Sequence, residues 1–264
     1  SVVLRLASLD LVRDNWRKYE SQIDDDNLVT SDRTVFDVSV VNLEENASKT
    51  PVNYVMPPGI QRVVDATNPQ LRELNEQAML LKVMDLEEGD ARGVYKNVSH
   101  DMLRYKTLLM DVHAEAIQGY PLDDEELTLF LRMGGDNVNN YYEYEIPLKL
   151  TPPGFYTDDE RGRLAVWPAE NKIQLPLRFL QTIKQKRNAA ARAAGKEVDL
   201  TEVYEMSVAD LGADVEAEML KHIVKVKGKP SLADIRTIMI GIRNPRSTYV
   251  TKGARSAEVW VNEL

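Results

Sequence analysis

Three polar residues near the middle of the chain have the types and spacing of a metal site. Asp111, His113 and Glu115 alternate with apolar residues, so on a β-strand their side chains point to one face. Zinc accepts carboxylate and imidazole ligands, but it usually needs a second histidine nearby, which this stretch lacks. A half-buried strand with its polar face in water shows the same alternation. We therefore expect an exposed polar stripe and leave open whether it holds a metal.

Clustered acidic residues point to another metal, calcium, which takes about six to eight oxygen ligands. Acidic runs occur at residues 24–27, 122–126 and 158–160. None has the spacing of a helix–loop–helix calcium site, and most runs of this kind are solvated loops. We predict that the protein needs no cofactor, with a structural calcium ion as the open alternative.

Other combinations of reactive residue types are weaker. Ser99, His100 and Asp101 are the three types of a hydrolase triad, but adjacent residues point apart, whereas a triad converges from separate positions. The Gly-Gly-Asp sequence at 134–136 lacks the Gly-Lys-Ser/Thr ending of a phosphate-binding loop, and we interpret it as a hairpin turn. No Gly-x-Ser-x-Gly nucleophile elbow occurs. We predict no catalytic residues and expect that the protein is not an enzyme.

Composition excludes several further classes of function. The 264 residues include 42 acidic and 33 basic side chains, and the net charge of -9 argues against a general nucleic-acid binder. The absence of cysteine excludes thiol catalysis, iron–sulfur clusters and disulfides. No stretch approaches the ~20 apolar residues of a membrane-spanning helix, and no secretory signal opens the chain. A basic cluster is interpreted as a helix face that pairs locally; its members are Lys184, Lys186, Arg187, Arg192 and Lys196.

The elements that must position these residues are mainly β-strands. Apolar and polar residues alternate with period two, a pattern typical of strands with one face on a core and the other in water. Pro147 cannot donate a hydrogen bond to a sheet, so its strand is predicted to lie at an edge or to contain a bulge. The predicted strands are 34–43, 79–86, 105–115, 127–133, 141–150, 172–179, 222–227, 235–243 and 257–264, and residues 1–6 are strand-like as well.

Helices are few. Residues 179–194 have a helical pattern, and Gly195 is a suitable C-terminal stop. Residues 68–77, with Pro69 in the first turn, are predicted to form a second short helix.

These elements predict a mainly β protein, an antiparallel β-sandwich of the galactose-binding-like or jelly-roll-like kind, with a short helical insertion at about 179–197. We favour a single domain over residues 1–264, and a split near residue 155 is the alternative. The strand-like start and the strand that stops in mid-pattern at the end lead us to expect a part of a longer polypeptide.

Several long motifs resemble one known family. They are similar, in order and over nearly the whole chain, to the SprA/Sov family, the outer-membrane translocons of the Bacteroidetes type IX secretion system, which is related to gliding motility. The departures lie mostly in loops, at 122–126 and 246–253. The motifs are 97–106 (NVSHDMLRYK), 110–115 (MDVHAE), 139–148 (NNYYEYEIPL), 237–245 (TIMIGIRNP) and 256–264 (SAEVWVNEL), with 42–46, 51–60 and 75–77 upstream.

The resemblance implies a soluble domain, not itself membrane-spanning, of a very large β-barrel protein in the outer membrane, on the cell-surface side. It implies a non-catalytic role, in which the domain caps or gates the pore or docks other proteins. Its partners would be other type IX secretion components, secreted cargo and the rest of the parent barrel, and nucleic acid would not be among them.

Two other functions are alternatives to this one. In a carbohydrate-binding module, Tyr141, Tyr142 and Tyr144 would line a sugar-binding face by stacking. In a glycoside hydrolase, two carboxylates from distant strands would act together, and such a pair leaves no local sequence signature.

Overall fold

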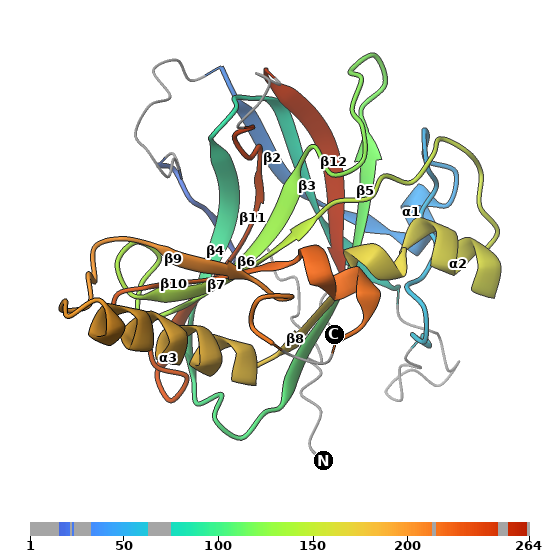
Figure 1. Cartoon of the computed structure of the whole chain (residues 1–264). Helices are drawn as coiled ribbons and strands as arrows, with labels where there is room; N and C mark the ends of the chain where they lie inside the picture. The colour runs from blue at the N-terminus through green and yellow to red at the C-terminus, as the bar shows by residue number, and fades with distance from the viewer. Residues whose placement is uncertain are drawn as a thin grey trace.

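Two antiparallel sheets make up the body of the protein (Figure 1). The computed structural model describes residues 16–21, 23, 33–62, 75–212, 215–247 and 253–262. The first sheet has, within these ranges, seven strands in the order β1 (Arg17–Lys18), β4 (Ala91–His100), β11 (Ile235–Arg243), β6 (Thr128–Gly134), β7 (Tyr141–Pro147), β10 (Ile223–Lys227) and β9 (Tyr204–Ser207). The second has five described strands in the order β2 (Val35–Asn42), β3 (Gln77–Leu86), β12 (Arg255–Asn262), β5 (Thr107–Ala116) and β8 (Ile173–Pro176).

The described part of the chain also contains short helices and one long helix. The α-helices are α1 (Leu43–Asn46), α2 (Glu160–Val166) and α3 (Arg178–Ala193), and two 3₁₀ helices are η1 (Ala169–Asn171) and η2 (Ala217–Lys221). No helix in the described ranges is both long and apolar enough to cross a membrane.

The core between the sheets confirms the predicted mainly β, sandwich-like fold. Leu108, Met110 and Val112 of β5 are buried in the same apolar cluster as Tyr144 and Ile146 of β7. Side chains two apart on each strand therefore share one interior, as the period-two pattern predicted. This cluster contains residues from both sides of position 155. The single domain and the likeness to galactose-binding-like sandwiches stay predictions.

The hairpin between β6 and β7 forms as predicted. The two strands pair from Thr128 opposite Pro147 to Gly134 opposite Tyr141. In the loop, the carboxylate of Asp136 accepts hydrogen bonds from backbone N–H groups, among them that of Val138 at 2.9 Å. Burial opposes the charge of this carboxylate, but these hydrogen bonds outweigh it and lower the pKa of Asp136 to about 2. The Gly-Gly-Asp sequence is thus a hairpin turn.

The prediction that Pro147 marks an edge strand or a bulge is wrong. β7 lies inside its sheet, between β6 and β10. Its pairing with β10 ends where Glu145 meets Ile223, two residues before the proline. The missing N–H of Pro147 therefore falls at the end of β7, beyond Ile223, the first residue of β10, where proline is tolerated.

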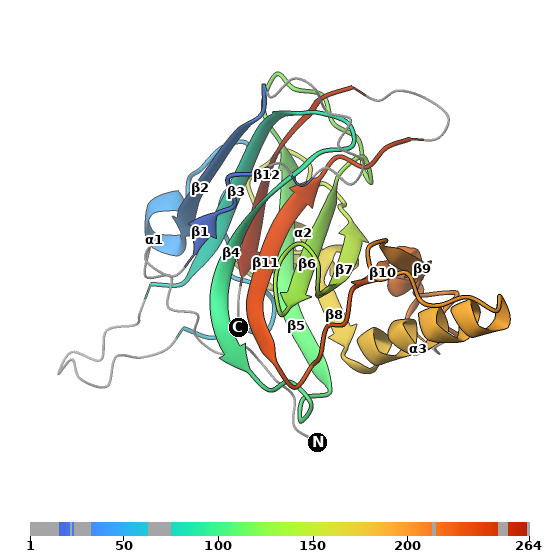
Figure 2. The ribbon, with the colours of Figure 1, turned by 90° about the vertical axis from the view of Figure 1, so that its left-hand side faces the viewer.

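The helix α3 matches the predicted insertion and covers part of the core. The N–H of Gly195, which has φ +65°, donates to Arg192 O, and the N–H of Lys196 donates to Ala191 O at 2.9 Å. This pair of bonds is a Schellman motif, which glycine favours because its φ is positive. Leu180 and Ile183 join the cluster that also contains Val224 and Val226 of β10. Figure 2 shows α3 beside β8 of one sheet and β9 and β10 of the other.

Several described elements were not predicted, and β4 and α2 are the longest strand and the longest helix among them. β4 was missed because Arg92 and Lys96 flank Val94 on its core-facing side, so no apolar stripe marks the strand. α2 begins at Glu160, the last residue of the acidic run at 158–160 that was interpreted as a loop. The predicted helix at 68–77 is wrong at its end, since Gln77 begins β3, while residues 68–74, the strand-like start at 1–6 and the acidic run at 24–27 lie outside the described residues.

Candidate functional site

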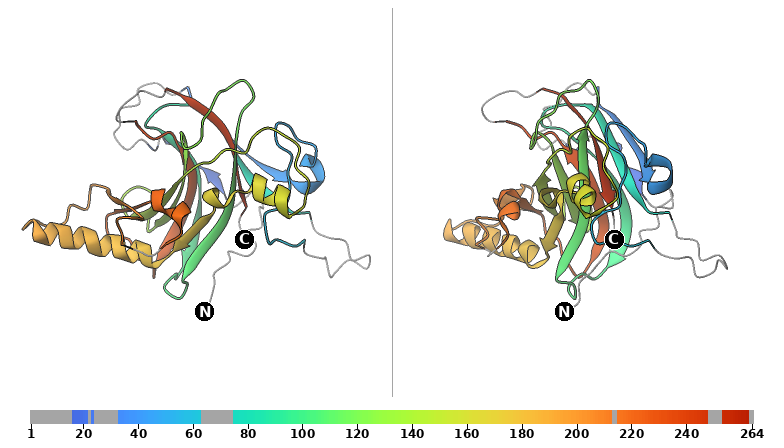
Figure 3. Two further views of the ribbon diagram at one scale, coloured as in Figure 1. Left: turned by 45° about the vertical axis from the view of Figure 1, so that its right-hand side comes forward. Right: turned by 90° about the vertical axis from the view of Figure 1, so that its right-hand side faces the viewer.

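The three polar residues of β5 are buried, not exposed as predicted. Asp111, His113 and Glu115 have exposed fractions of 5%, 0% and 1%. They point away from the main core, but residues 43–62 and 151–171 cross that outer face of the five-stranded sheet. We name these two segments the covering layer. Figure 3 shows its helices α1 and α2 on the opposite side of the sheets from α3.

Hydrogen bonds hold the covering layer together and attach it to β5. Asn53 Nδ2 donates to Tyr156 O at 2.9 Å, and the N–H of Tyr156 donates to Asn53 Oδ1 at 2.7 Å. On the sheet, His113 Nδ1 lies 2.8 Å from Val166 O and 3.1 Å from Thr151 Oγ1. His113 Nδ1 thus finds its partners in the covering layer instead of in water, as buried polar atoms usually do.

Glu115, one of the three candidate metal ligands, forms an ion pair with a lysine of the covering layer. Glu115 of β5 and Glu258 of β12 are directly opposite each other, and like charges in such a pair repel. Lys49 of the covering layer lies 2.5 Å from Glu115 and 2.8 Å from Glu258. Burial would raise the pKa of Glu115, but His113 and Lys49 lower it by hydrogen bonding and charge. No three acidic or histidine side chains in the described ranges are arranged to hold a metal ion.

Aromatic rings surround this charged group and form a second core. The ring of Trp260 lies opposite His113 on the neighbouring strand, with 3.8 Å between ring centroids. Tyr54 and Trp167 of the covering layer contact the other sides of Trp260, with centroids 5.5 and 6.1 Å away. Trp167 Nε1 donates to Val55 O at 2.8 Å. The second core therefore fixes the covering layer onto β12 and β5.

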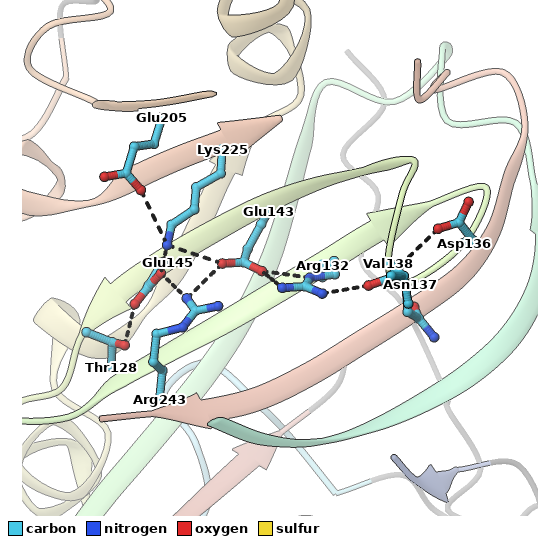
Figure 4. A network of polar contacts seen from close by, with 10 residues as sticks. All are labelled: Thr128, Arg132, Asp136, Asn137, Val138, Glu143, Glu145, Glu205, Lys225 and Arg243. Atoms are coloured by element: carbon cyan, nitrogen blue, oxygen red, sulfur yellow. Dashed lines mark hydrogen bonds and ion pairs between the residues drawn. The ribbon is translucent and has the colours of Figure 1, made fainter. Parts of the chain in front are cut away.

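The outer face of the seven-stranded sheet carries a row of alternating charges (Figure 4). Across four adjacent strands, Glu205 of β9 is opposite Lys225 of β10, which is opposite Glu143 of β7, which is opposite Arg132 of β6. The ion pairs along the row measure 3.5, 3.6 and 2.7 Å. Opposite charges in directly opposed positions stabilise neighbouring strands.

Arg243 of β11 and Glu145 of β7 extend this row, and we call the six side chains the charge ladder. Arg243 Nη1 lies 2.8 Å from Glu143 Oε1 and also contacts Glu145, which pairs with Lys225 Nζ at 2.8 Å. Burial would raise the pKa of Glu143, but the charges of Arg243, Arg132 and Lys225 lower it strongly. The same carboxylates raise the pKa of Lys225 against the effect of burial.

The charge ladder contradicts the expected polar face in water. Glu143 and Glu145 point away from the core between the sheets, yet both are buried together with Arg132, Lys225 and Arg243. Two rings help to cover the cations, because Arg132 lies over Tyr141 at 3.9 Å and Arg243 over Phe130 at 4.8 Å. Buried charges are tolerated only when they are paired, and here each has a partner of opposite sign.

The other sequence candidates are distributed over the surface or the core. Ser99, His100 and Asp101 are exposed at the end of β4. The tyrosines at 141, 142 and 144 are buried, so they do not form the exposed stacking face that the alternative of a carbohydrate-binding module assigned to them. Strand alternation indicated which way these rings point but could not show what covers them.

The described acidic runs have partners within the protein. Asp159 caps α2 by accepting a hydrogen bond from the N–H of Gly162 at 2.8 Å, and Asp158 pairs with Arg163 at 2.6 Å. Glu126 pairs with Arg255 at 2.6 Å. These carboxylates are used for capping and for ion pairs, which is a structural account of the runs at 122–126 and 158–160.

His222, which the sequence did not single out, is buried beside the core. Its Nδ1 lies 2.6 Å from the hydroxyl of Tyr144, while its Nε2 has no hydrogen-bond partner among the described groups. Burial disfavours the charged imidazolium and lowers the pKa of His222 to about 4.

Acid is expected to destabilise the protein partly through His222. The folded pKa of about 4 lies below the 6.5 of an ordinary histidine, so between these values the unfolded chain binds the extra proton. Stability that is present above pH 6.5 is therefore lost as the pH falls to 4, by about 3 kcal/mol in total. Urea unfolding at several pH values measures this loss. The free energy of unfolding should fall less steeply with decreasing pH in His222→Gln and as steeply as in the unmodified protein in His100→Gln. The same pH dependence in all three proteins would contradict the assignment.

The charge ladder connects neighbouring strands, and the ion pairs of Lys49 with Glu115 and Glu258 connect the covering layer to β5 and β12. Their acids and bases touch one another inside the protein, so each charge is stabilised in one geometry and the strands that carry them are held in register.

Comparison with known proteins identifies a family. The family model SprA_N, described as motility related/secretion protein, matches residues 1–264. No curated protein matches the chain.

Proposed function

The chain belongs to the SprA_N family of motility-related/secretion proteins, as its motifs indicated, and on this premise we propose a non-catalytic structural and interaction role in protein export. The chain would be a domain of an outer-membrane translocon of the Bacteroidetes type IX secretion system. Its work would be mechanical, either capping or gating the pore or docking secretion partners and cargo.

One observation carries the mechanical part of this proposal. Glu143 contacts Arg132, Arg243 and Lys225, which come from three other strands of the sheet. Breaking a buried ion pair costs several kcal/mol, so strands joined in this way resist sliding past one another. The covering layer is joined to the second sheet in the same manner through Lys49. A domain that caps a pore or passes a load needs such cross-strand connections.

An open sheet edge supports the docking part. Among the described strands, β9 pairs only with β10, so its other side has backbone N–H and C=O groups facing away from the sheet. An extended segment of a partner or cargo protein can add to such an edge as a further strand. The charge ladder ends at this edge, because Glu205 of β9 pairs with Lys225.

Photo-cross-linking in secreting cells tests this function. A cross-linker at Val203, which is exposed and directly precedes β9, is expected to capture secretion components or secreted cargo. The matched control is a cross-linker at Phe155, an exposed residue of the covering layer, which should capture far less. Failure of both positions to capture any secretion protein, together with saturable glycan binding in calorimetry, would replace this proposal with the carbohydrate-binding module.

A further inference from the structure

Three cations surround a surface cavity between α3 and the turn that follows β10. The cavity has a volume of about 450 Å³, and Lys184, Arg187 and Lys229 line it. Glu197, just beyond the end of α3, is the acidic residue in its wall. We call this site the cationic pocket. None of the side chains of the charge ladder or the second core takes part in it.

The fold holds the three cations in place. Lys184 and Arg187 are three residues apart on α3 and share one face of the helix. Lys184 Nζ donates to Pro230 O at 2.7 Å, and Arg187 Nη1 donates to Gly228 O at 2.9 Å. Lys229 lies between these two carbonyl groups, so the turn brings its side chain to the same place.

The turn itself is rigid. Gly228 has φ +66°, and a Cβ added there would lie 2.0 Å from Asn139 O, so only glycine fits. The N–H of Lys229 donates to Asn140 Oδ1 at 3.0 Å, which attaches the turn to the loop between β6 and β7. The wall of the cationic pocket is therefore fixed to the end of the seven-stranded sheet at which β10 and the loop between β6 and β7 meet.

The charge of this pocket is not neutralised by the protein. Lys49, Lys172 and Lys225 each have a carboxylate within 4.0 Å, as do most buried cations of the described part. Lys184 and Arg187 instead donate to neutral carbonyl groups, and no ion pair joins either of them or Lys229 to a described carboxylate. Burial, Arg187 and Lys229 lower the pKa of Lys184, which is the sign of like charges close together. A cluster of three cations without an ion-pair partner, in a chain of net charge -9, favours the binding of an anion from outside the protein.

We propose that the cationic pocket binds a phosphate group. Three cations and the single carboxylate of Glu197 leave a net charge of two, which matches the charge of about -1.5 to -2 that a phosphate monoester carries at pH 7. A single carboxylate would neutralise only half of it. Arg187 has an exposed fraction of 5%, and its Nη2 donates to no described residue, so its planar guanidinium is fixed with a donor left over for an oxyanion. The phosphate would come from a soluble phosphorylated compound or from a lipid headgroup.

Calorimetric titration of the protein with inorganic phosphate at low ionic strength tests the pocket. We expect saturable binding of one phosphate, weakened at least ~tenfold by Lys184→Gln and by Lys229→Gln. Lys186→Gln is the matched control, since this lysine lies on the same helix and donates to Asp210 O, outside the pocket. Thermal unfolding of each variant verifies that it is folded. No saturable binding, or equal weakening by Lys186→Gln, would overturn the proposal.

Two further titrations distinguish the sources of the phosphate. Glycerol 3-phosphate represents a soluble monoester, and phosphatidylcholine vesicles that contain phosphatidic acid represent a headgroup, with pure phosphatidylcholine vesicles as the blank. Binding of the monoester alone assigns a soluble compound, and binding of the phosphatidic acid vesicles as well assigns a headgroup. Failure of both, or vesicle binding that survives Lys229→Gln, counts against the pocket.

Discussion

Replacement of Glu143 by glutamine is expected to lower the free energy of unfolding by about 3–5 kcal/mol. Glutamine keeps the shape of the side chain but removes the negative charge that Arg132, Arg243 and Lys225 share. These cations are buried, and water cannot replace the lost partner. Urea unfolding followed by circular dichroism measures the change as a lower midpoint at a similar slope.

Glu205→Gln is the matched control for this prediction. Glu205 also pairs with Lys225, at 3.5 Å, but its side chain is 57% exposed at the end of the charge ladder. Solvent screens exposed pairs, so we expect a loss of less than ~1 kcal/mol. A Glu143→Gln protein no less stable than Glu205→Gln would show that the charge ladder does not hold the seven-stranded sheet together.

Replacement of Trp260 by alanine is expected to cost about 3–5 kcal/mol. This indole is fully buried in the second core, stacked on His113 and in contact with Tyr54 and Trp167. Its removal leaves a cavity between β12 and the covering layer, because close-packed neighbours relax only in part. Urea unfolding measures the loss, and limited proteolysis should show earlier cleavage within residues 43–62.

Phe155→Ala is the control for an aromatic residue of the covering layer that is not in the second core. Phe155 is 75% exposed, so its truncation should change the free energy of unfolding by less than ~0.5 kcal/mol. Trp260→Phe keeps most of the buried ring and should lose less than Trp260→Ala. Equal stability of Trp260→Ala and Phe155→Ala would mean that the second core contributes nothing.

Much of the fold followed from local patterns. The strand predicted at 235–243 is β11 with the same bounds, and the helix predicted at 179–194 is α3 displaced by one residue. Both signals are local, since an apolar stripe with period two or a glycine stop after an apolar helix face is read from neighbouring residues. The family was also recognisable, because its motifs are long and occur in order over the chain.

The candidate sites were harder to predict. Alternation along β5 showed correctly that Asp111, His113 and Glu115 share a face, but a polar face toward water and one beneath a further layer have the same pattern. Lys49 lies 66 positions from Glu115 in the chain, and nothing near Glu115 indicated it. The same holds for Arg243 and Glu143, which are 100 positions apart.

The sequence by itself determined where most strands lie and which of their side chains share a face. It also determined the long helix, the hairpin turn and the family, because each depends on neighbouring residues or on recognisable motifs. Only the tertiary structure decided which polar faces are buried, which charges neutralise one another and where three cations remain without a carboxylate. Burial and ion pairing depend on which distant segments meet, and that is set by the packing of the whole chain.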